Sequence, residues 1–388
     1  MNHQSERMMA VRNPVIPDVG ALIRANPGTI SLGQGVVHYS PPKEVFEEVA
    51  RFGSQISDHH YQSAAGVPAL RDMLKDKLAR ENDIVLHEDQ ELVVTAGSNL
   101  GFYHAVMCIC DPGDEVILMS PYFFNHEMAV CMANCRPVLA PTDTNYQLQL
   151  DVIEACISEH TRAIVTVSPN NPAGVVYAPE AIAAVNELCA QRGLYHLCDE
   201  AYEYFTYEGA RHYSAGANAD SRQCTLSLFS FSKSFSLASW RVGYMVWPRH
   251  LLRSFEKSQD TLLICPPVVS QHAAIGALKA GSGYLDDRIE TLGRVRRMCL
   301  ERLDELGSRC FVPEANGAFY LLARLDTNLG SMRVVERLIT EFGVAVLPGT
   351  GFGLEDDCRI RIAYGALEPH TVAEGADRLA KGLRSIIP

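Results

Sequence analysis

Short apolar runs that alternate with helical patterns constrain the fold of this chain more than any other feature. Amphipathic segments separate several of the runs, and one of them, Pro179–Arg192, has its apolar residues at helical spacing. Such alternation is typical of a largely parallel sheet with helices on both faces, so we expect an α/β fold. The runs, read as strands, are Leu92–Thr95, Glu115–Met119, Ala163–Val167, Leu194–Cys198, Thr225–Phe229 and Val242–Val246.

The pattern changes after about Gly283, where a long charged helical stretch is followed by mixed strands and helices. A chain of 388 residues is also too long for one simple core. We therefore predict a large domain over residues 45–285. Residues 1–44 and 286–388 are expected to form a smaller α/β domain together.

Charge and hydropathy exclude several classes of partner. The net charge of −12 argues against a nucleic-acid or anionic membrane surface. No apolar run approaches the roughly 18 uncharged residues that a membrane span needs, and the N-terminus lacks the apolar core and cleavage site of a secretion signal. We expect a cytoplasmic protein with no nucleic-acid or membrane partner.

The 12 cysteines are scattered and lie mostly within apolar stretches. Cys108-x-Cys110 and Cys131-xxx-Cys135 lack the second pair or the histidines of a zinc site. This pattern favours reduced, buried thiols in a cytosolic protein and predicts no metal.

The residues directly after each apolar run are informative because ligands of open parallel sheets bind beyond the carboxyl ends of the strands. Ser98 follows one run in a Gly-Ser turn, Asn170 and Asn171 follow another in SPNNPAG, and Asp199 ends a third. Taken singly, these are an ordinary turn, an Asx-type turn and a helix cap. An acid at the end of a buried strand nevertheless needs a partner, which favours a ligand or catalytic role for Asp199.

The segment SFSKSFSLASWR follows the next run and contains Ser230, Lys233 and Arg241. Read alone, it favours a solvated surface lysine. Together with Ser98 and Asp199, however, it supplies groups for a phosphate, an amine for an aldehyde, and a carboxylate for a basic ring nitrogen. Pyridoxal 5′-phosphate (PLP) meets these demands, and a lysine imine with an aspartate at the pyridinium nitrogen is its known signature.

At this point the chain resembles the class I/II aminotransferases, which are fold-type I PLP-dependent enzymes, from about Ile30 to Ala363. SFSKSFSLASWRVGY resembles the family's Schiff-base signature, SPNNPAG its Asn-Pro-x-Gly turn and CDEAY its Asp-x-x-Tyr. ISLGQG, YQSAAGVPALR and CRIRIAY resemble further family segments. The resemblance implies a large PLP-binding domain with a mostly parallel central sheet, flanked by helices, and a smaller α/β domain.

The resemblance also implies roles for residues around the cofactor ring. Lys233 would form the imine and, once released, move the proton between Cα and C4′. Asp199 would keep the pyridine nitrogen protonated. Tyr202 and Asn171 would hydrogen-bond the 3′-oxygen, and Phe123 would stack on the ring.

The phosphate and the second subunit involve another set of residues. Ser230, Arg241 and the backbone amides of Ser98 and Asn99 would hold the phosphate. Tyr61 would reach the phosphate of the neighbouring subunit's cofactor, so the resemblance implies a homodimer with shared active sites.

Substrate contacts are expected from Gly35, Asn171 and Arg359. Arg359 would clamp the substrate α-carboxylate through a bidentate pair. Arg361 lies two residues along on the same strand face and is the main rival for that role.

The predicted activity is transfer of an amino group from an amino acid to a 2-oxo acid by a ping-pong mechanism. Two alternatives stay open: a C–S β-lyase using the same motifs, and a non-catalytic PLP-binding sensor. Such sensors usually carry an N-terminal DNA-binding module, and a match that begins by about residue 30 leaves no room for one.

A neutral or aromatic amino-acid donor is expected. The segment SQDTLLICPPVVSQ, which lies near the substrate side chain in relatives, contains no Arg or Lys. The position after Ser98, which is basic in some aspartate-preferring relatives, is Asn99.

Overall fold

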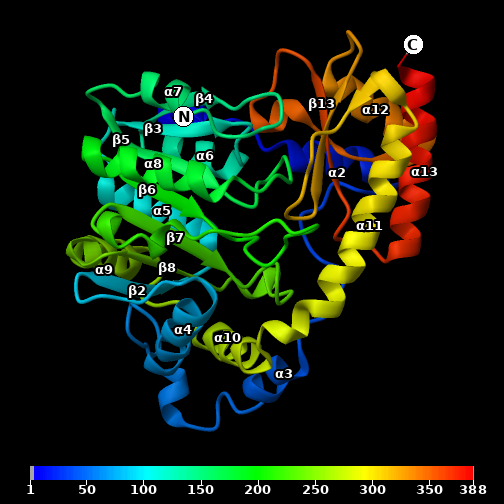
Figure 1. Ribbon diagram of the computed structural model, residues 1–388. Coiled ribbons are helices and arrows are strands. Elements are labelled where there is room, and N and C mark those ends of the chain that lie inside the picture. Colours follow the sequence, from blue (N-terminus) through cyan, green and yellow to red (C-terminus); the bar gives the residue numbers. More distant parts are fainter. Residues whose placement is uncertain (1–3, 388) are drawn as a thin grey trace.

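A computed structural model describes residues 4–387, and its centre is a seven-stranded sheet in the order β2-β8-β7-β6-β5-β3-β4 (Figure 1). The predicted α/β fold is confirmed, and each apolar run named above overlaps a strand. The strands are β2 (Gln90–Thr95), β3 (Glu115–Ser120), β4 (Arg136–Pro141), β5 (Thr161–Val167), β6 (Tyr195–Asp199), β7 (Thr225–Ser230) and β8 (Gly243–Pro248).

Strand β4 was not predicted from the sequence. It lies at one edge of the sheet, pairs only with β3 and has mostly half-buried or exposed residues. Its sequence RPVLAP therefore lacks the continuous apolar run of a central strand, and its prolines are tolerated because an edge strand has one unpaired side.

Strand direction decides which residues reach the functional edge of the sheet. The pairs β3–β4, β3–β5, β5–β6 and β6–β7 are parallel, whereas β8 runs antiparallel to both β2 and β7. Gly243, the first residue of β8, therefore pairs with Thr95 and Ser230 near the carboxyl ends of their strands. Arg241, two residues earlier, thus arrives at the same edge as the strand ends.

Helices cover both faces of this sheet (Figure 1). Alternation along β2 illustrates the two layers: Val93 packs in the cluster that includes Phe102 and Phe255, whereas Leu92 and Val94 pack in the cluster that includes α4 and α10. The covering helices are α3 (Lys43–Val49), α4 (Pro68–Glu81), α5 (Ser98–Ile109), α6 (Phe124–Met132), α7 (Leu150–Ala155), α8 (Pro179–Arg192), α9 (Leu252–Leu262) and α10 (Val268–Ala280).

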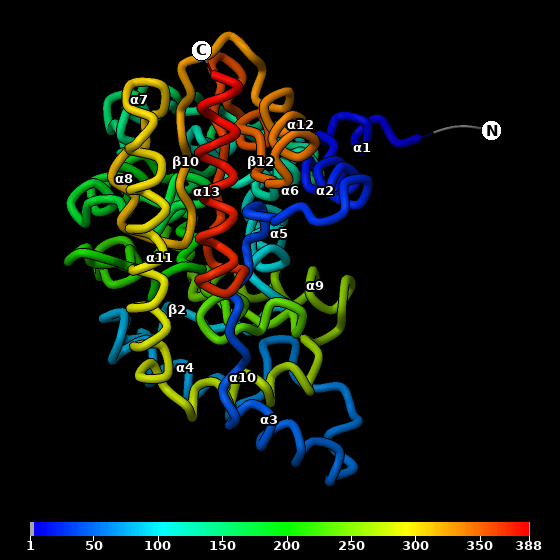
Figure 2. The backbone as a smooth tube through the Cα atoms, turned by 90° about the vertical axis from the view of Figure 1, so that its right-hand side faces the viewer, coloured from blue at the N-terminus to red at the C-terminus, as the bar shows by residue number. Residues whose placement is uncertain are grey.

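The C-terminal part has its own antiparallel sheet in the order β12-β13-β10-β9. Figure 2 shows α11 alongside α13, and the two helices are in contact. The elements of this part are α11 (Asp286–Asp304), β9 (Cys310–Phe311), β10 (Tyr320–Leu325), α12 (Ser331–Phe342), β11 (Val344–Ala345), β12 (Leu347–Pro348), β13 (Cys358–Ala363) and α13 (Pro369–Ile386).

The N-terminal segment, with α1 (Glu6–Ala10), α2 (Val15–Ala25) and β1 (Ile30–Ser31), joins the C-terminal part. Strand β1 pairs in parallel with β11, and α2 contacts α12. These contacts support the proposed division into a large domain, 45–285, and a smaller domain built from 1–44 and 286–388, and the boundaries themselves stay a prediction.

Two further features concern the whole described chain. Its 12 cysteines are all free and are either buried or half-buried. Between residues 4 and 387, no helix combines the length and the apolar character needed to cross a membrane.

Candidate active site

A cavity of about 240 Å³ lies at the carboxyl edge of the large sheet, where β5, β6 and β7 end and α5 begins. It brings together most of the residues singled out from the sequence. These are Gly35, Ser98, Asn99, Phe123, Asn171, Asp199, Tyr202, Ser230, Lys233 and Arg241.

Lys233 provides the cavity's amine. Its Nζ donates a 2.5 Å hydrogen bond to the carbonyl oxygen of Gly35 and lies 5.7 Å from the centre of the Tyr202 ring. Burial lowers the pKa of Lys233 to about 8, and the positive charges of Arg361 and Arg241 act in the same direction, against the opposing effect of Asp199. A fraction of this amine is therefore neutral, and nucleophilic, near physiological pH.

Asp199 ends β6, and its carboxylate contacts the half-buried Ala201 and the buried His126. Oδ1 accepts a 3.1 Å hydrogen bond from the backbone N–H of Ala201, and Oδ2 lies 3.0 Å from Nε2 of His126. The His126 ring stacks on Phe102 at a centroid distance of 4.0 Å and meets the edge of Phe123. These contacts fix the direction in which the carboxylate faces the cavity.

Sequence reasoning missed His126. It lies near the start of α6 in SPYFFNHE, three residues after Phe123, and nothing local distinguishes it from a core histidine. The one signal that could have identified His126 was its closeness in sequence to Phe123, an aromatic residue predicted for the site.

Hydrogen bonds join the side chains of Asn171, Tyr202 and Tyr320, which all line the cavity. The hydroxyls of Tyr202 and Tyr320 lie 2.7 Å apart, and Asn171 Nδ2 donates to Tyr202 Oη at 3.3 Å. Burial, and then the neighbouring Tyr320, raise the pKa of Tyr202 well above its usual value, so its phenol keeps its proton. Tyr320 was also missed, because in GAFYLLARL it looks like a core residue of a strand.

The two neighbouring asparagines of SPNNPAG have different roles. Asn170 Oδ1 accepts a 2.9 Å hydrogen bond from the backbone N–H of Ala173, three residues on, and so stabilises the turn. Asn171 instead lines the cavity. The ordinary turn reading therefore holds for the first asparagine and not for the second.

One end of the cavity lies at the N-terminus of α5. Ser98 is the first residue of this helix, and within residues 4–387 its buried Oγ has no hydrogen-bond partner. Ser230 and Arg241 line the cavity as well. Gly97 has φ +84°, and a Cβ there would lie 2.3 Å from Arg241 Nη2, so only glycine allows this approach. Free hydroxyl and N–H groups at a helix N-terminus beside a guanidinium suit an anion with several oxygens.

Arg361, and not Arg359, lines the cavity. Arg361 is buried, and its Nη1 and Nη2 donate to Asn171 Oδ1 at 2.9 Å and to the Gly33 carbonyl at 2.7 Å. Arg359 is held by Asp357, with Nε–Oδ1 and Nη2–Oδ2 distances of 2.7 and 2.9 Å. This placement corrects the expectation for Arg359, because its guanidinium is already paired outside the cavity.

Tyr61 does not lie at the cavity of its own chain. It is 78% exposed and precedes α4 in an irregular segment. Its expected role in a neighbouring subunit stays a prediction.

Comparisons with known proteins identify the family of the chain. The profile of the family described as "Aminotransferase class I and II" matches residues 27–379. The chain is 32% identical to an aromatic aminotransferase (ISS1) of Arabidopsis thaliana, with 99% of this chain and 97% of that protein covered. It is 30% identical to an aspartate aminotransferase of Pyrococcus abyssi, with 92% of each chain covered. The solved structure of a double mutant of Thermus thermophilus aspartate aminotransferase superimposes with a TM-score of 0.90 at 29% identity, covering 98% of this chain and all of that one.

Proposed function

The chain belongs to the class I and II aminotransferases, and from this premise we propose that its cavity holds PLP, bound through Lys233. As an aminotransferase it moves an amino group between an amino acid and a 2-oxo acid. One observation carries the proposal for the cofactor: a single cavity unites a lysine of lowered pKa, a buried carboxylate and an anion pocket.

The residues of the cavity fit this cofactor group by group. The Ser98 hydroxyl, which has no partner within residues 4–387, supplies together with Ser230 and Arg241 the donors that a phosphate needs. Asp199 offers an acceptor for a protonated ring nitrogen, and Phe123 offers an aromatic face. When bound, PLP supplies an aldehyde for the amine and a ring that accepts the electron pair left at the substrate Cα.

The proton chemistry is assigned to Lys233. With PLP in the cavity and the substrate amine in place of Lys233, the neutral Nζ of Lys233 would be free to take the proton from the substrate Cα. The Gly35 carbonyl, 2.5 Å away, accepts a hydrogen bond from this amine and keeps it in the cavity. Asp199 would face the ring nitrogen, because Ala201 N–H and His126 contact its two oxygens and orient the carboxylate.

Arg361 is proposed as the clamp for the substrate α-carboxylate. Two of its nitrogens are held by the Asn171 side chain and the Gly33 carbonyl, which fixes the plane of the guanidinium. A planar, preoriented guanidinium matches a carboxylate through paired hydrogen bonds, and burial strengthens the attraction.

The donor is proposed to be a neutral, apolar or aromatic amino acid. Among the described residues that line the cavity, the cations are Lys233, Arg241 and Arg361, and each already has a role. No cation of this chain's own cavity is then left for a second carboxylate. Ile16 and Phe124 add apolar surface to the lining, which suits an apolar side chain.

The working unit is proposed to be a homodimer with Tyr61 completing the phosphate site of the neighbouring subunit. Its support is the high exposure of Tyr61 together with Ile56, also 78% exposed, in the same segment. An exposed aromatic and an exposed aliphatic side chain close together are typical of surfaces that a partner covers.

Absorbance spectroscopy tests the cofactor and the reaction together. Purified protein mixed with PLP should show a visible band, which a neutral or aromatic amino acid bleaches and a 2-oxo acid restores. A band that persists while pyruvate or a thiol accumulates would indicate a lyase. If neither the wild type nor Lys233→Ala shows the visible band, the assignment of Lys233 is wrong. If aspartate is the best donor, the proposed donor class is wrong.

A further inference from the structure

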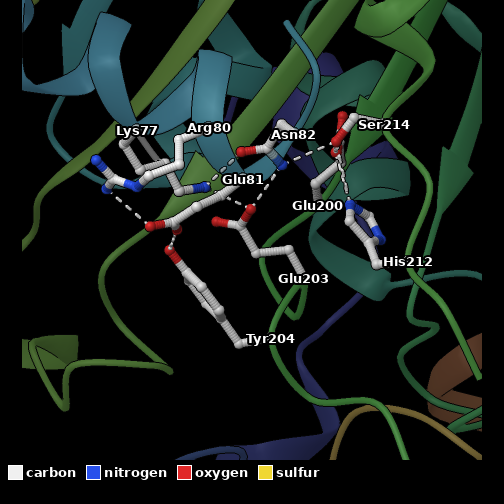
Figure 3. Close-up of polar contacts among 9 residues, drawn as sticks. All are labelled: Lys77, Arg80, Glu81, Asn82, Glu200, Glu203, Tyr204, His212 and Ser214. Carbon is white, nitrogen blue, oxygen red and sulfur yellow. Dashed lines mark hydrogen bonds and ion pairs between the residues drawn. The ribbon is translucent and has the colours of Figure 1, made fainter. Parts of the chain in front are cut away.

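A buried polar network lies behind the cavity and joins α4 to the turn that follows β6 (Figure 3). Lys77 on α4 and Glu203 form an ion pair at 2.5 Å, with side chains 3% and 8% exposed. Asn82, just after α4, accepts from Lys77 Nζ at 2.7 Å and donates to Glu203 Oε2 at 2.8 Å. Lys77 and Glu203 therefore compensate each other's charge in a site with little access to water.

The network continues to a second carboxylate. Asn82 Nδ2 also donates to Ser214 Oγ at 2.9 Å, and the Ser214 hydroxyl donates to Glu200. The Nε2 of His212 lies 2.8 Å from Glu200 Oε2. Figure 3 shows Asn82 between Glu203 on one side and Ser214 on the other, so this one side chain ties the two halves together.

The two carboxylates alternate in sequence with two residues of the cavity. Glu200 directly follows Asp199, and Glu203 directly follows Tyr202. Asp199 and Tyr202 line the cavity, whereas Glu200 and Glu203 are held by the network behind it. Asp199 and Tyr202 are therefore each adjacent in the sequence to a glutamate that the network holds in place.

Other contacts hold the same turn against α4. The Lys77 ammonium lies 5.1 Å from the centre of the Tyr204 ring and 5.0 Å from that of Phe229 on β7. The Tyr204 hydroxyl donates to Glu81 Oε2 at 2.6 Å. The last turn of α4 therefore holds the turn that follows β6 through an ion pair, a hydrogen bond and cation–π contacts.

We propose that Lys77, Asn82, Glu200, Glu203 and Ser214 are positioning residues that hold Asp199 and Tyr202 at the places where they meet the cofactor. This inference rests on the proposed function. None of the five lines the cavity, so they act through the backbone of residues 199–203. Such buried polar networks have few alternative arrangements and specify one geometry.

Glu203→Gln and its charge-balanced double variant test the proposal in the PLP-loaded enzyme. Glu203→Gln keeps the shape but leaves Lys77 unpaired, so it should lower the melting temperature and reduce kcat by about 10- to 100-fold, since small displacements of catalytic groups have effects of that size. The KM for the donor should change little because Arg361 is untouched. Lys77→Met/Glu203→Gln removes the unpaired charge and should regain melting temperature but not kcat.

Two readouts besides activity distinguish positioning from stability. The pH at which the visible band titrates and the rate of PLP loss on dialysis should both change in the two variants. The matched control is Glu115→Gln, which removes a buried carboxylate, 7% exposed, from its ion pair with Arg136 at the opposite end of the sheet. It should lower the melting temperature alone.

The outcomes distinguish a positioning role of the network from a purely stabilising one. If Glu203→Gln does not fold, Ser214→Ala removes the bridging hydroxyl more gently and should give the same spectral shift. A double variant that regains wild-type kcat and band titration together with its melting temperature overturns the positioning role. A wild-type enzyme that shows no PLP band removes the proposed function, and this inference with it.

Discussion

Nε2 of His126 lies 3.0 Å from Oδ2 of Asp199, and both side chains are almost inaccessible to solvent. The carboxylate at the end of β6 is therefore held from α6, an element well separated from it in the sequence. Because a neighbouring imidazole can fix the direction of a carboxylate, His126 bears directly on the role proposed for Asp199.

Replacement of His126 by phenylalanine should keep the stack on Phe102 and remove the ring nitrogen. We expect kcat to fall about ten-fold, which corresponds to about 1.4 kcal/mol of transition-state stabilisation. Steady-state kinetics with the best donor measures the change. His104→Phe is the matched control, since His104 is a buried histidine against Phe255 outside the cavity and should leave kcat unaltered. Equal kinetics for both variants would refute the role of His126.

The two arginines of β13 should respond differently to the same change. Arg361→Lys keeps a charge but loses the paired hydrogen bonds, so we expect the KM of donor and 2-oxo acid to rise by about 100-fold, the effect of about 2.7 kcal/mol. Arg359→Lys should change KM by less than about two-fold because Arg359 is paired with Asp357 away from the cavity. The reverse pattern would restore the original expectation for Arg359.

The pKa of Lys233 predicts a pH-dependent stability for the cofactor-free protein. Burial, followed by the positive charge of Arg361, lowers this pKa from 10.5 to about 8. Below pH 8 the folded protein must hold an ammonium that its surroundings disfavour, whereas the unfolded chain hydrates it. The resulting destabilisation is complete below pH 8 and disappears as pH rises to 10.5.

Lys233→Met isolates this effect. The cofactor-free variant should melt at a higher temperature than the cofactor-free wild type below pH 8, and the difference should shrink between pH 8 and 10.5. Thermal denaturation followed by circular dichroism at several pH values gives both curves. A difference that does not depend on pH would mean that the lysine is not perturbed in the folded protein.

Ser98→Ala should weaken the binding of PLP without harming the fold. Loss of one hydrogen bond to a charged phosphate is expected to raise the dissociation constant about ten-fold. The cofactor-free protein should melt as before, because the Ser98 hydroxyl has no partner among the described residues. Ser331→Ala serves as control: this serine is also buried without a partner at the start of a helix, α12, but lies outside the cavity. Equilibrium dialysis measures the dissociation constant for PLP, which should rise in Ser98→Ala and stay unchanged in Ser331→Ala.

Tyr61 predicts complementation between two defective chains. Lys233→Ala and Tyr61→Ala should each be impaired alone. A mixed dimer contains one site with Lys233 from one chain and an intact Tyr61 from its partner, so mixing after brief dissociation should regain activity. Analytical ultracentrifugation checks the dimer. A fully active monomer, or no gain on mixing, would contradict the shared site.

Much of the site could be predicted because its residues lie directly after strands. Lys233 and Asp199 stand out by chemistry at the ends of apolar runs, and both line the cavity. Helix α8 begins and ends at the residues that its apolar spacing indicated, Pro179 and Arg192. Periodicity and strand-end chemistry are local properties, so a single sequence reveals them.

Other residues could not be found locally. His126 and Tyr320 resemble core residues, and only packing shows the first against Asp199 and the second against Tyr202. The anchors Glu200 and Glu203 look like solvated acids in CDEAYEYF, although both are buried or nearly so. Glu203 pairs with Lys77, far away in the chain, and Glu200 lies against His212 in the loop that follows the turn.

The sequence by itself determined the α/β class, six of the seven strands of the large sheet and most of the chemical groups of the site. Tertiary structure alone decided that β8 runs antiparallel, which delivers Arg241 to the edge where Ser98 and Ser230 lie. It also decided between Arg359 and Arg361, which share a strand face: Arg359 pairs with the nearby Asp357, whereas Arg361 reaches the Asn171 side chain and the Gly33 carbonyl, far away in the chain. Strand direction and side-chain partners depend on contacts between segments far apart in the chain, and local periodicity carries no record of those contacts.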